Sequence, residues 1–293
     1  MAQNIYQIYD KIFKKILTLS SGAVVNLING LFGTDYPRDS TITYNWTEFV
    51  GDELRRVLAD TIITINDTDS YHIEAQMTED EDIIFRVFEY GFMYAGRKRM
   101  GDRYGCRLNL PQPKIIYLYS DENVPEEYVL SLYVGNDKLA DYKVSAFKFL
   151  ETDTETLNRN KMVILIPFAL LKMRKVMKNA RTPENIEALQ NIIQSDIIGS
   201  IEKNLAAGNI TVADAQRLKR LTHKLYEHIY SHYDELEVLN EMTDESLMLD
   251  IDIIEKKHEE ELALIIAEKD RALQNKDKEI EELKRLLMEK ELH

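Results

Sequence analysis

Residues 59–76 read Ala-Asp-Thr-Ile-Ile-Thr-Ile, then Asn-Asp-Thr-Asp, then Ser, then Tyr-His-Ile-Glu-Ala-Gln. A β-branched stretch before a polar turn and a stretch of alternating apolar and polar residues after it predict a β-hairpin. Strand side chains alternate between two faces, so Glu74 and Gln76 share one face, and the turn brings Asp60 back beside them. Two acids and an amide at one end of a sheet suit a hard divalent cation such as Mg²⁺. We therefore predict a metal-dependent phosphodiesterase site.

A simpler interpretation of the hairpin needs no metal. Asp60 can be an exposed acid at a strand edge, and Glu74 and Gln76 can be the polar side of an amphipathic strand. The same alternation places His72 on the face of Glu74 as an additional polar neighbour. The helices predicted before and after the hairpin favour the metal site.

The segment from about Glu81 to Arg99 has apolar and aromatic residues at helical spacing, and Thr78 is its predicted N-cap. Arg86 and Tyr90 lie one turn apart and share a face. Directed toward the acidic hairpin, they would orient a phosphate and tether a carboxylate. An ordinary exposed Arg–Tyr pair is the alternative.

A first helix is predicted from Ile8, with an interruption around residues 20–22. Asp10 and Lys14 share one face of this helix. Asp10 can help to position a metal-bound water, or it can be a helix cap or a surface partner of Lys14.

One ordered set of residues spans about the first hundred positions: Asp10 with Phe13 and Lys14, Asp60, Glu74 with Gln76, and Arg86 with Tyr90. In order and spacing the set resembles the PD-(D/E)XK nucleases, specifically the Rpn family of recombination-promoting nucleases and transposase-related proteins. The resemblance implies an α/β fold whose core is a restriction-endonuclease-like mixed sheet flanked by helices. It also implies that Asp60 and Glu74 hold Mg²⁺, with Mn²⁺ as a substitute, and that the substrate is DNA.

The chain departs from the general nuclease pattern at two positions. Ala59 replaces a proline that shapes only the backbone. Gln76 replaces the signature lysine, and a neutral amide supplies no charge to a developing phosphorane, although the Rpn-like group commonly has glutamine there. Arg86 or a second metal would supply the missing positive charge. The implied reaction is hydrolysis by metal-activated water.

Composition limits the partners and the compartment. A net charge of −14 opposes DNA binding, which normally requires a basic surface. One basic run follows the Arg86 helix and is the expected DNA contact: Arg97, Lys98, Arg99, Arg103 and Arg107. The alternative is that this run only stabilises a helix end. A single cysteine, the lack of a secretory signal and the lack of a long apolar run predict a cytoplasmic protein with no membrane contact.

The rest of the chain divides by pattern into three predicted parts. Residues 1–180 form the nuclease-like domain, with further strands at 114–119, 128–134, 144–150 and 162–168. Residues 181–249 form a helical subdomain, a hairpin of two helices that start at Thr182-Pro183 and near Thr211. Residues 250–293 form a charged helix.

Apolar residues recur at every seventh position of this last helix, which predicts a coiled coil: Ile266, Leu273, Ile280 and Leu287. Lys269 and Lys276 fall at companion core positions, so a single solvated helix is the alternative. A paired helix would join two copies of the chain as a homodimer.

These patterns together predict a Mg²⁺-dependent DNA endonuclease of the recombination-promoting type. The alternative function belongs to another class: a catalytically silent protein that keeps the nuclease fold and works as a binding or assembly module.

Overall fold

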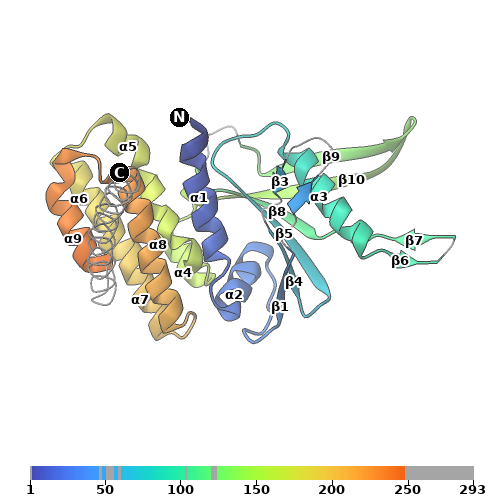
Figure 1. Ribbon diagram of the computed structural model, residues 1–293, viewed down its shortest axis with the longest axis horizontal. Helices are drawn as coiled ribbons and strands as arrows, with labels where there is room; N and C mark the ends of the chain where they lie inside the picture. Colours follow the sequence, from blue (N-terminus) through green and yellow to red (C-terminus); the bar gives the residue numbers. More distant parts are fainter. Residues whose placement is uncertain are drawn as a thin grey trace, which may run out of the picture. The chain divides into compact units, whose positions relative to one another are not determined.

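A computed structural model describes residues 2–45, 48–50, 56–58, 61–102, 104–119 and 124–247 (Figure 1). Its centre is a six-stranded sheet with the order β1-β4-β5-β8-β10-β9. Neighbouring strands are antiparallel, except that β8 is parallel to both β5 and β10. The strands are β1 (Ile42–Asn45), β4 (Thr61–Ile65), β5 (Asp69–Gln76), β8 (Gln112–Tyr117), β9 (Glu127–Val134) and β10 (Asp137–Lys148). A mixed sheet flanked by helices confirms the predicted α/β class.

The β4–β5 hairpin forms where the sequence predicts it. Ile65 pairs with Asp69 across the turn, and Asn66 and Asp67 have positive φ values of 51° and 57°. Asn and Asp tolerate this left-handed conformation, which matches the twist of the two strands. Two short ribbons complete the strands: β2 (Glu48–Val50) with β3 (Arg56–Leu58), and β6 (Met100–Gly101) with β7 (Cys106–Arg107).

Helices cover both faces of the sheet, so its side chains divide between two cores. Ile73 on β5 joins Phe13 and Leu27 in the large core on the side of the first two helices. Ile115 joins Val87 of the third helix in a smaller core on the opposite face. Because strand side chains alternate, Glu74 faces the third helix. These helices are α1 (Ala2–Ile16), α2 (Ser21–Phe32) and α3 (Ile83–Arg97).

The predicted helical hairpin is confirmed, with both of its start signals. The Thr182 side chain accepts a hydrogen bond from Asn185 N, and Thr211 forms a reciprocal capping box with Asp214. The first arm is α6 (Pro183–Asn191), a π-helical segment (Ile192–Ile198) and α7 (Gly199–Ala206), and the second is α8 (Val212–Tyr230). The other helices of this half are α4 (Thr154–Arg159), α5 (Arg174–Asn179) and α9 (Glu237–Leu247).

Two local predictions are wrong. The predicted strand at 162–168 is instead the start of a buried 3₁₀ segment, Val163–Met173, with Met162 as its N-cap. A continuous apolar run does not distinguish a buried strand from a buried helix, and this run has Pro167 inside it. Thr78 does not cap α3, because the N-cap position is occupied by Asp82. The backbone N–H of Asp82 donates to the Asp80 carboxylate.

Residues 1–247 form one compact unit, in which the helical hairpin shares the large core with the sheet. Residues 250–293, with the predicted coiled coil, lie outside the described residues. Among the described helices none is by itself long and apolar enough to cross a membrane; α1 and α2 pass this test only together, as a pair bent by 106°.

Candidate functional site

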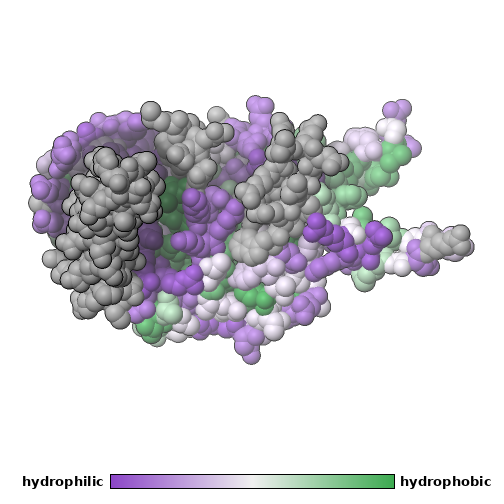
Figure 2. All heavy atoms as spheres, in the orientation of Figure 1, coloured by the Kyte–Doolittle hydropathy of each residue, from purple (hydrophilic) through white to green (hydrophobic). Residues whose placement is uncertain are grey.

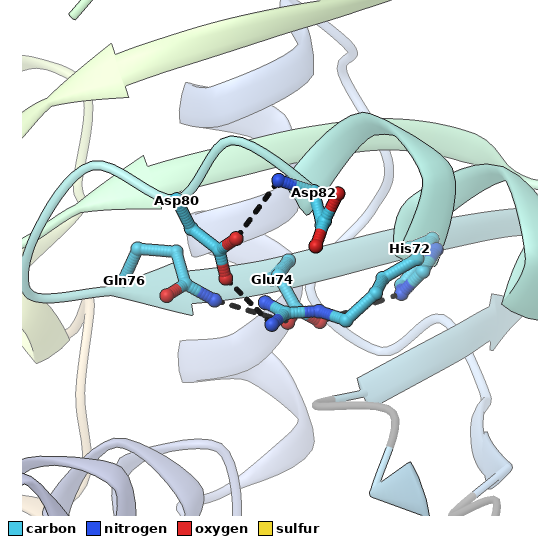
Figure 3. Close-up of polar contacts among 6 residues, drawn as sticks. His72, Glu74, Gln76, Asp80 and Asp82 are labelled. Atoms are coloured by element: carbon cyan, nitrogen blue, oxygen red, sulfur yellow. Dashed lines mark hydrogen bonds and ion pairs between the residues drawn. The ribbon is translucent and has the colours of Figure 1, made fainter.

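The α3-facing side of β5 carries the polar residues that the sequence singles out (Figure 3). His72 and Glu74 are buried, with 0% and 3% of their surface exposed, and Gln76 is half-buried at the strand end. A carboxylate so far from water requires compensating charge or hydrogen bonds. The neighbours of Glu74 therefore define the site.

Arg86, one turn into α3, supplies the opposing charge. Its Nη2 donates to Glu74 Oε1 at 3.2 Å, and its Nη1 donates to Asp80 Oδ2 at 2.6 Å. Burial would by itself lower the pKa of Arg86, but the carboxylates of Glu74 and Asp80 raise it above its usual value. Arg86 therefore stays charged, and one of its guanidinium nitrogens faces each acid.

Gln76 and His72 flank Glu74 along the strand. Gln76 Nε2 donates to Glu74 Oε1 at 3.1 Å, so the amide shares one carboxylate oxygen with Arg86. The other oxygen, Oε2, lies 3.9 Å from His72 Nε2. Burial lowers the pKa of His72 to about 4, so the imidazole is neutral at pH 7. The net charge of Glu74, Arg86 and Asp80 together is −1.

The structure gathers four of the predicted site residues: Glu74, Gln76, Arg86 and Tyr90. Tyr90 is buried one turn after Arg86, and its ring centroid lies 6.1 Å from that of His72. Asp80 also belongs to the cluster, although it was not among the predicted site residues. It lies before α3 and reaches Arg86 because of the way the chain turns between β5 and α3, which residue spacing does not indicate.

Two predicted site residues are not part of this described cluster. Asp10 forms an ion pair of 3.0 Å with Lys14 on α1. This pair is the alternative in which Asp10 is a surface partner of Lys14. In addition, α1 packs into the core on the face of the sheet opposite to Glu74. Asp60 lies outside the described residues.

The described donors meet only part of what a metal ion needs. Across the described ranges, no group of three or more His, Cys, Asp or Glu side chains is arranged to hold a metal. Mg²⁺, however, usually binds through one or two carboxylates and fills its other positions with water and substrate oxygens. Glu74 provides one such carboxylate at the end of a strand, so the residues fit Mg²⁺ if one further acid joins it.

The predicted DNA-contact residues follow α3. Arg97, Lys98, Arg99 and Arg107 are exposed, whereas Arg103 lies outside the described residues. Lys98 Nζ donates to Tyr94 OH at 2.7 Å, which supports the alternative in which the run partly stabilises the helix end. Arg97 is the last residue of α3, Arg99 follows the helix, and Arg107 lies on the β6–β7 ribbon.

Two hairpins, β6–β7 and β9–β10, extend from the same end of the molecule (Figure 1). The tip of β9–β10 carries exposed apolar residues, among them Val134 and Leu139, at 64% and 66% exposed (Figure 2). On the β6–β7 ribbon, the predicted DNA-contact residue with a described position is Arg107.

Comparison of the chain with protein-family models, with curated proteins and with solved structures gave no match.

Proposed function

We propose that this protein is a Mg²⁺-dependent endonuclease that hydrolyses DNA phosphodiester bonds, of the recombination-promoting, Rpn-like kind. The observation that carries the proposal is Glu74, a carboxylate with 3% of its surface exposed, which accepts hydrogen bonds from both Arg86 and Gln76. A buried acid is costly unless it has a function or a partner. Here the partners hold it two residues before the end of β5, beside the Arg86 side chain, which is 36% exposed.

Asp60 is the proposed second ligand. It directly precedes Thr61, whose partner across the hairpin is Ile73, the residue before Glu74. Mg²⁺ held by these two acids would neutralise the scissile phosphate and lower the pKa of a bound water. The order of elements agrees with this proposal: an antiparallel β4–β5 hairpin is followed by α3 and by β8, which is parallel to β5.

Arg86 is the proposed phosphate-orienting residue. Its guanidinium is about one third exposed and spans Glu74 and Asp80. A guanidinium can exchange a carboxylate partner for two phosphate oxygens without losing its geometry. Gln76 can only hydrogen-bond, so Arg86 supplies the positive charge that the signature lysine would otherwise provide.

Plasmid cleavage in the presence of Mg²⁺ tests the proposal directly. Glu74→Gln and Asp60→Asn should abolish cleavage, because each removes the charge of one ligand and nearly keeps its shape. Glu79→Gln is the matched control, since Glu79 is an exposed acid on the turn that also carries Asp80. Mn²⁺ binding measured by electron paramagnetic resonance gives a readout besides activity. Cleavage and Mn²⁺ binding that persist in both ligand variants would refute the proposal.

One observation favours the alternative, a silent nuclease fold that serves as a binding module. Arg86 already satisfies both Glu74 and Asp80, so the cluster is stable as a purely structural network. A parent protein that cleaves no DNA with Mg²⁺ or Mn²⁺, and in which Gln76→Lys restores no cleavage, would favour this module.

We further propose that residues 250–293 pair two copies of the chain, which would place two sites on one duplex. Sedimentation of the full chain and of a version ending at Leu247 tests this. The full chain should sediment as a dimer and the shortened chain as a monomer. Equal association states would refute pairing through this segment.

A further inference from the structure

A polar cavity of about 350 Å³ lies at the end of α2, where the chain after this helix meets the turn after α4. Its volume is that of a pocket for a small molecule. Three cationic side chains line it, together with amide and hydroxyl groups and one acid: Arg38, Arg159, Lys161, Asn29, Thr34 and Asp35. The lining is therefore positively charged in a chain whose net charge is −14.

Two of the three cations, Arg38 and Arg159, hydrogen-bond to neutral groups. Arg38 donates to the backbone oxygen of Gly208, and Arg159 Nη2 donates to Thr156 Oγ1 at 3.1 Å. In the described part of the chain, none of Arg38, Arg159 and Lys161 forms an ion pair within 4.0 Å. Three cations and one acid, Asp35, line the same polar cavity, and this excess of positive charge suits an anionic ligand.

Hydrogen bonds and a close helix–turn approach form the frame of the cavity. The Asn29 side chain donates to Tyr36 O and accepts from Thr34 Oγ1, both at 2.9 Å, which fixes the loop after α2. Lys161 has a φ of 56°, a left-handed conformation that a lysine rarely adopts. Gly30 lets the helix approach this turn, because a Cβ at this position would lie 2.4 Å from Met162 Cγ.

The cavity is separate from the Glu74 cluster. α2 packs into the large core, on the face of the sheet opposite to α3. No residue that lines the cavity belongs to the cluster of Glu74, Arg86 and Gln76. Loss of one site should therefore leave the other intact.

We propose that this cavity binds a small phosphate-bearing molecule. Two guanidinium groups can each offer paired N–H donors to phosphate oxygens, and the lysine ammonium adds a third charge. The side-chain amide of Asn160 and the hydroxyl of Thr34 are suited to the polar remainder of the ligand. The mainly polar lining disfavours an apolar ligand.

Titration calorimetry with inorganic phosphate, pyrophosphate and adenosine monophosphate at constant ionic strength tests the proposal. The test variant is Arg159→Gln combined with Lys161→Asn, because asparagine tolerates the left-handed backbone at this position. Lys175→Gln combined with Lys178→Gln is the matched control, which removes the same charge from exposed positions on α5. Circular dichroism verifies that both variants are folded.

The parent and the control should bind at least one of these probes saturably, and the test variant should bind it roughly ten- to a hundredfold more weakly. Tighter binding of adenosine monophosphate than of phosphate would identify a nucleotide as the source of the phosphate, and equal binding would identify the free ion. Absence of saturable binding of all three probes, or equal affinity in the parent and the test variant, would overturn the proposal. DNA cleavage should be the same in all variants.

Discussion

His72 should make the protein lose stability when the pH falls below about 6.5. Its imidazole is fully buried between β5 and α3, and within the described residues neither ring nitrogen has a partner that meets hydrogen-bond geometry. Burial lowers the pKa of His72 to about 4, and this effect outweighs the opposing influence of the Val87 backbone. The unfolded chain has the ordinary histidine pKa of about 6.5. Protons therefore bind preferentially to the unfolded state.

The sign and size of this pH effect follow from the linkage between proton binding and folding. A histidine whose pKa is lowered by folding does not affect the free energy of unfolding at pH values above both its unfolded-state and its folded-state pKa. As the pH falls from the first pKa to the second, the histidine increasingly destabilises the fold. With pKa values of about 6.5 and about 4, the loss is about 2 kcal/mol between pH 8 and pH 5. It reaches about 3 kcal/mol below pH 4.

Urea unfolding of the parent and of His72→Leu near pH 8, 6.5 and 5 measures how much stability His72 costs at low pH. Leucine has a similar volume and no proton to bind, so the variant should lose about 2 kcal/mol less than the parent over this range. It should be at least as stable as the parent near pH 8, since no polar atom is left buried without a partner. His232→Gln, at an exposed histidine, should follow the parent.

Equal pH dependence in the parent and His72→Leu would refute this reasoning. It would mean that His72 binds a proton in the folded state as readily as in the unfolded one. Glu74 Oε2, 3.9 Å from His72 Nε2, is the group that would then hold the protonated ring.

Two further predictions concern stability. Asp214→Ala should lower the free energy of unfolding in urea by about 2 to 4 kcal/mol. The buried Asp214 carboxylate accepts hydrogen bonds from the backbone N and the hydroxyl of Ser20, and it also caps α8. A loss below about 0.5 kcal/mol would contradict a stabilising role for the contact between Asp214 and Ser20. Gly30→Ala should lower stability by about 1 to 3 kcal/mol, since its Cβ would lie 2.4 Å from Met162 Cγ. Gly96→Ala, on α3 with no atom within 4 Å of its Cβ, should instead raise stability by up to about 1 kcal/mol, and thermal unfolding of both variants checks the pair.

Sequence patterns predicted local structure correctly where all the interacting residues lie within one short stretch of the chain. The Asn66-Asp67 turn and the Thr182-Pro183 start each depend on bonds within a few residues, and each forms as predicted. The run from Met162 failed because its environment, burial on all sides, is the same for a strand and for a helix.

In the candidate site, too, some residues could be placed by their spacing in the sequence and one could not. Strand alternation correctly placed Glu74, Gln76 and His72 on one face, and helical spacing placed Arg86 and Tyr90 together. The contribution of Asp80 depends on how the chain turns between β5 and α3, which spacing does not describe.

The sequence by itself determined the hairpin, the capped helices and the set of polar side chains on β5, because turn chemistry, capping and alternation act over short distances. Only the tertiary structure decided that α3 covers that face and that Arg86 joins Glu74 to Asp80. It also decided that Arg38, which is distant in the chain from Arg159 and Lys161, lines the same cavity as these two residues. The physical reason is that charge compensation and burial depend on distances between elements, and these distances are set by the packing of the two cores.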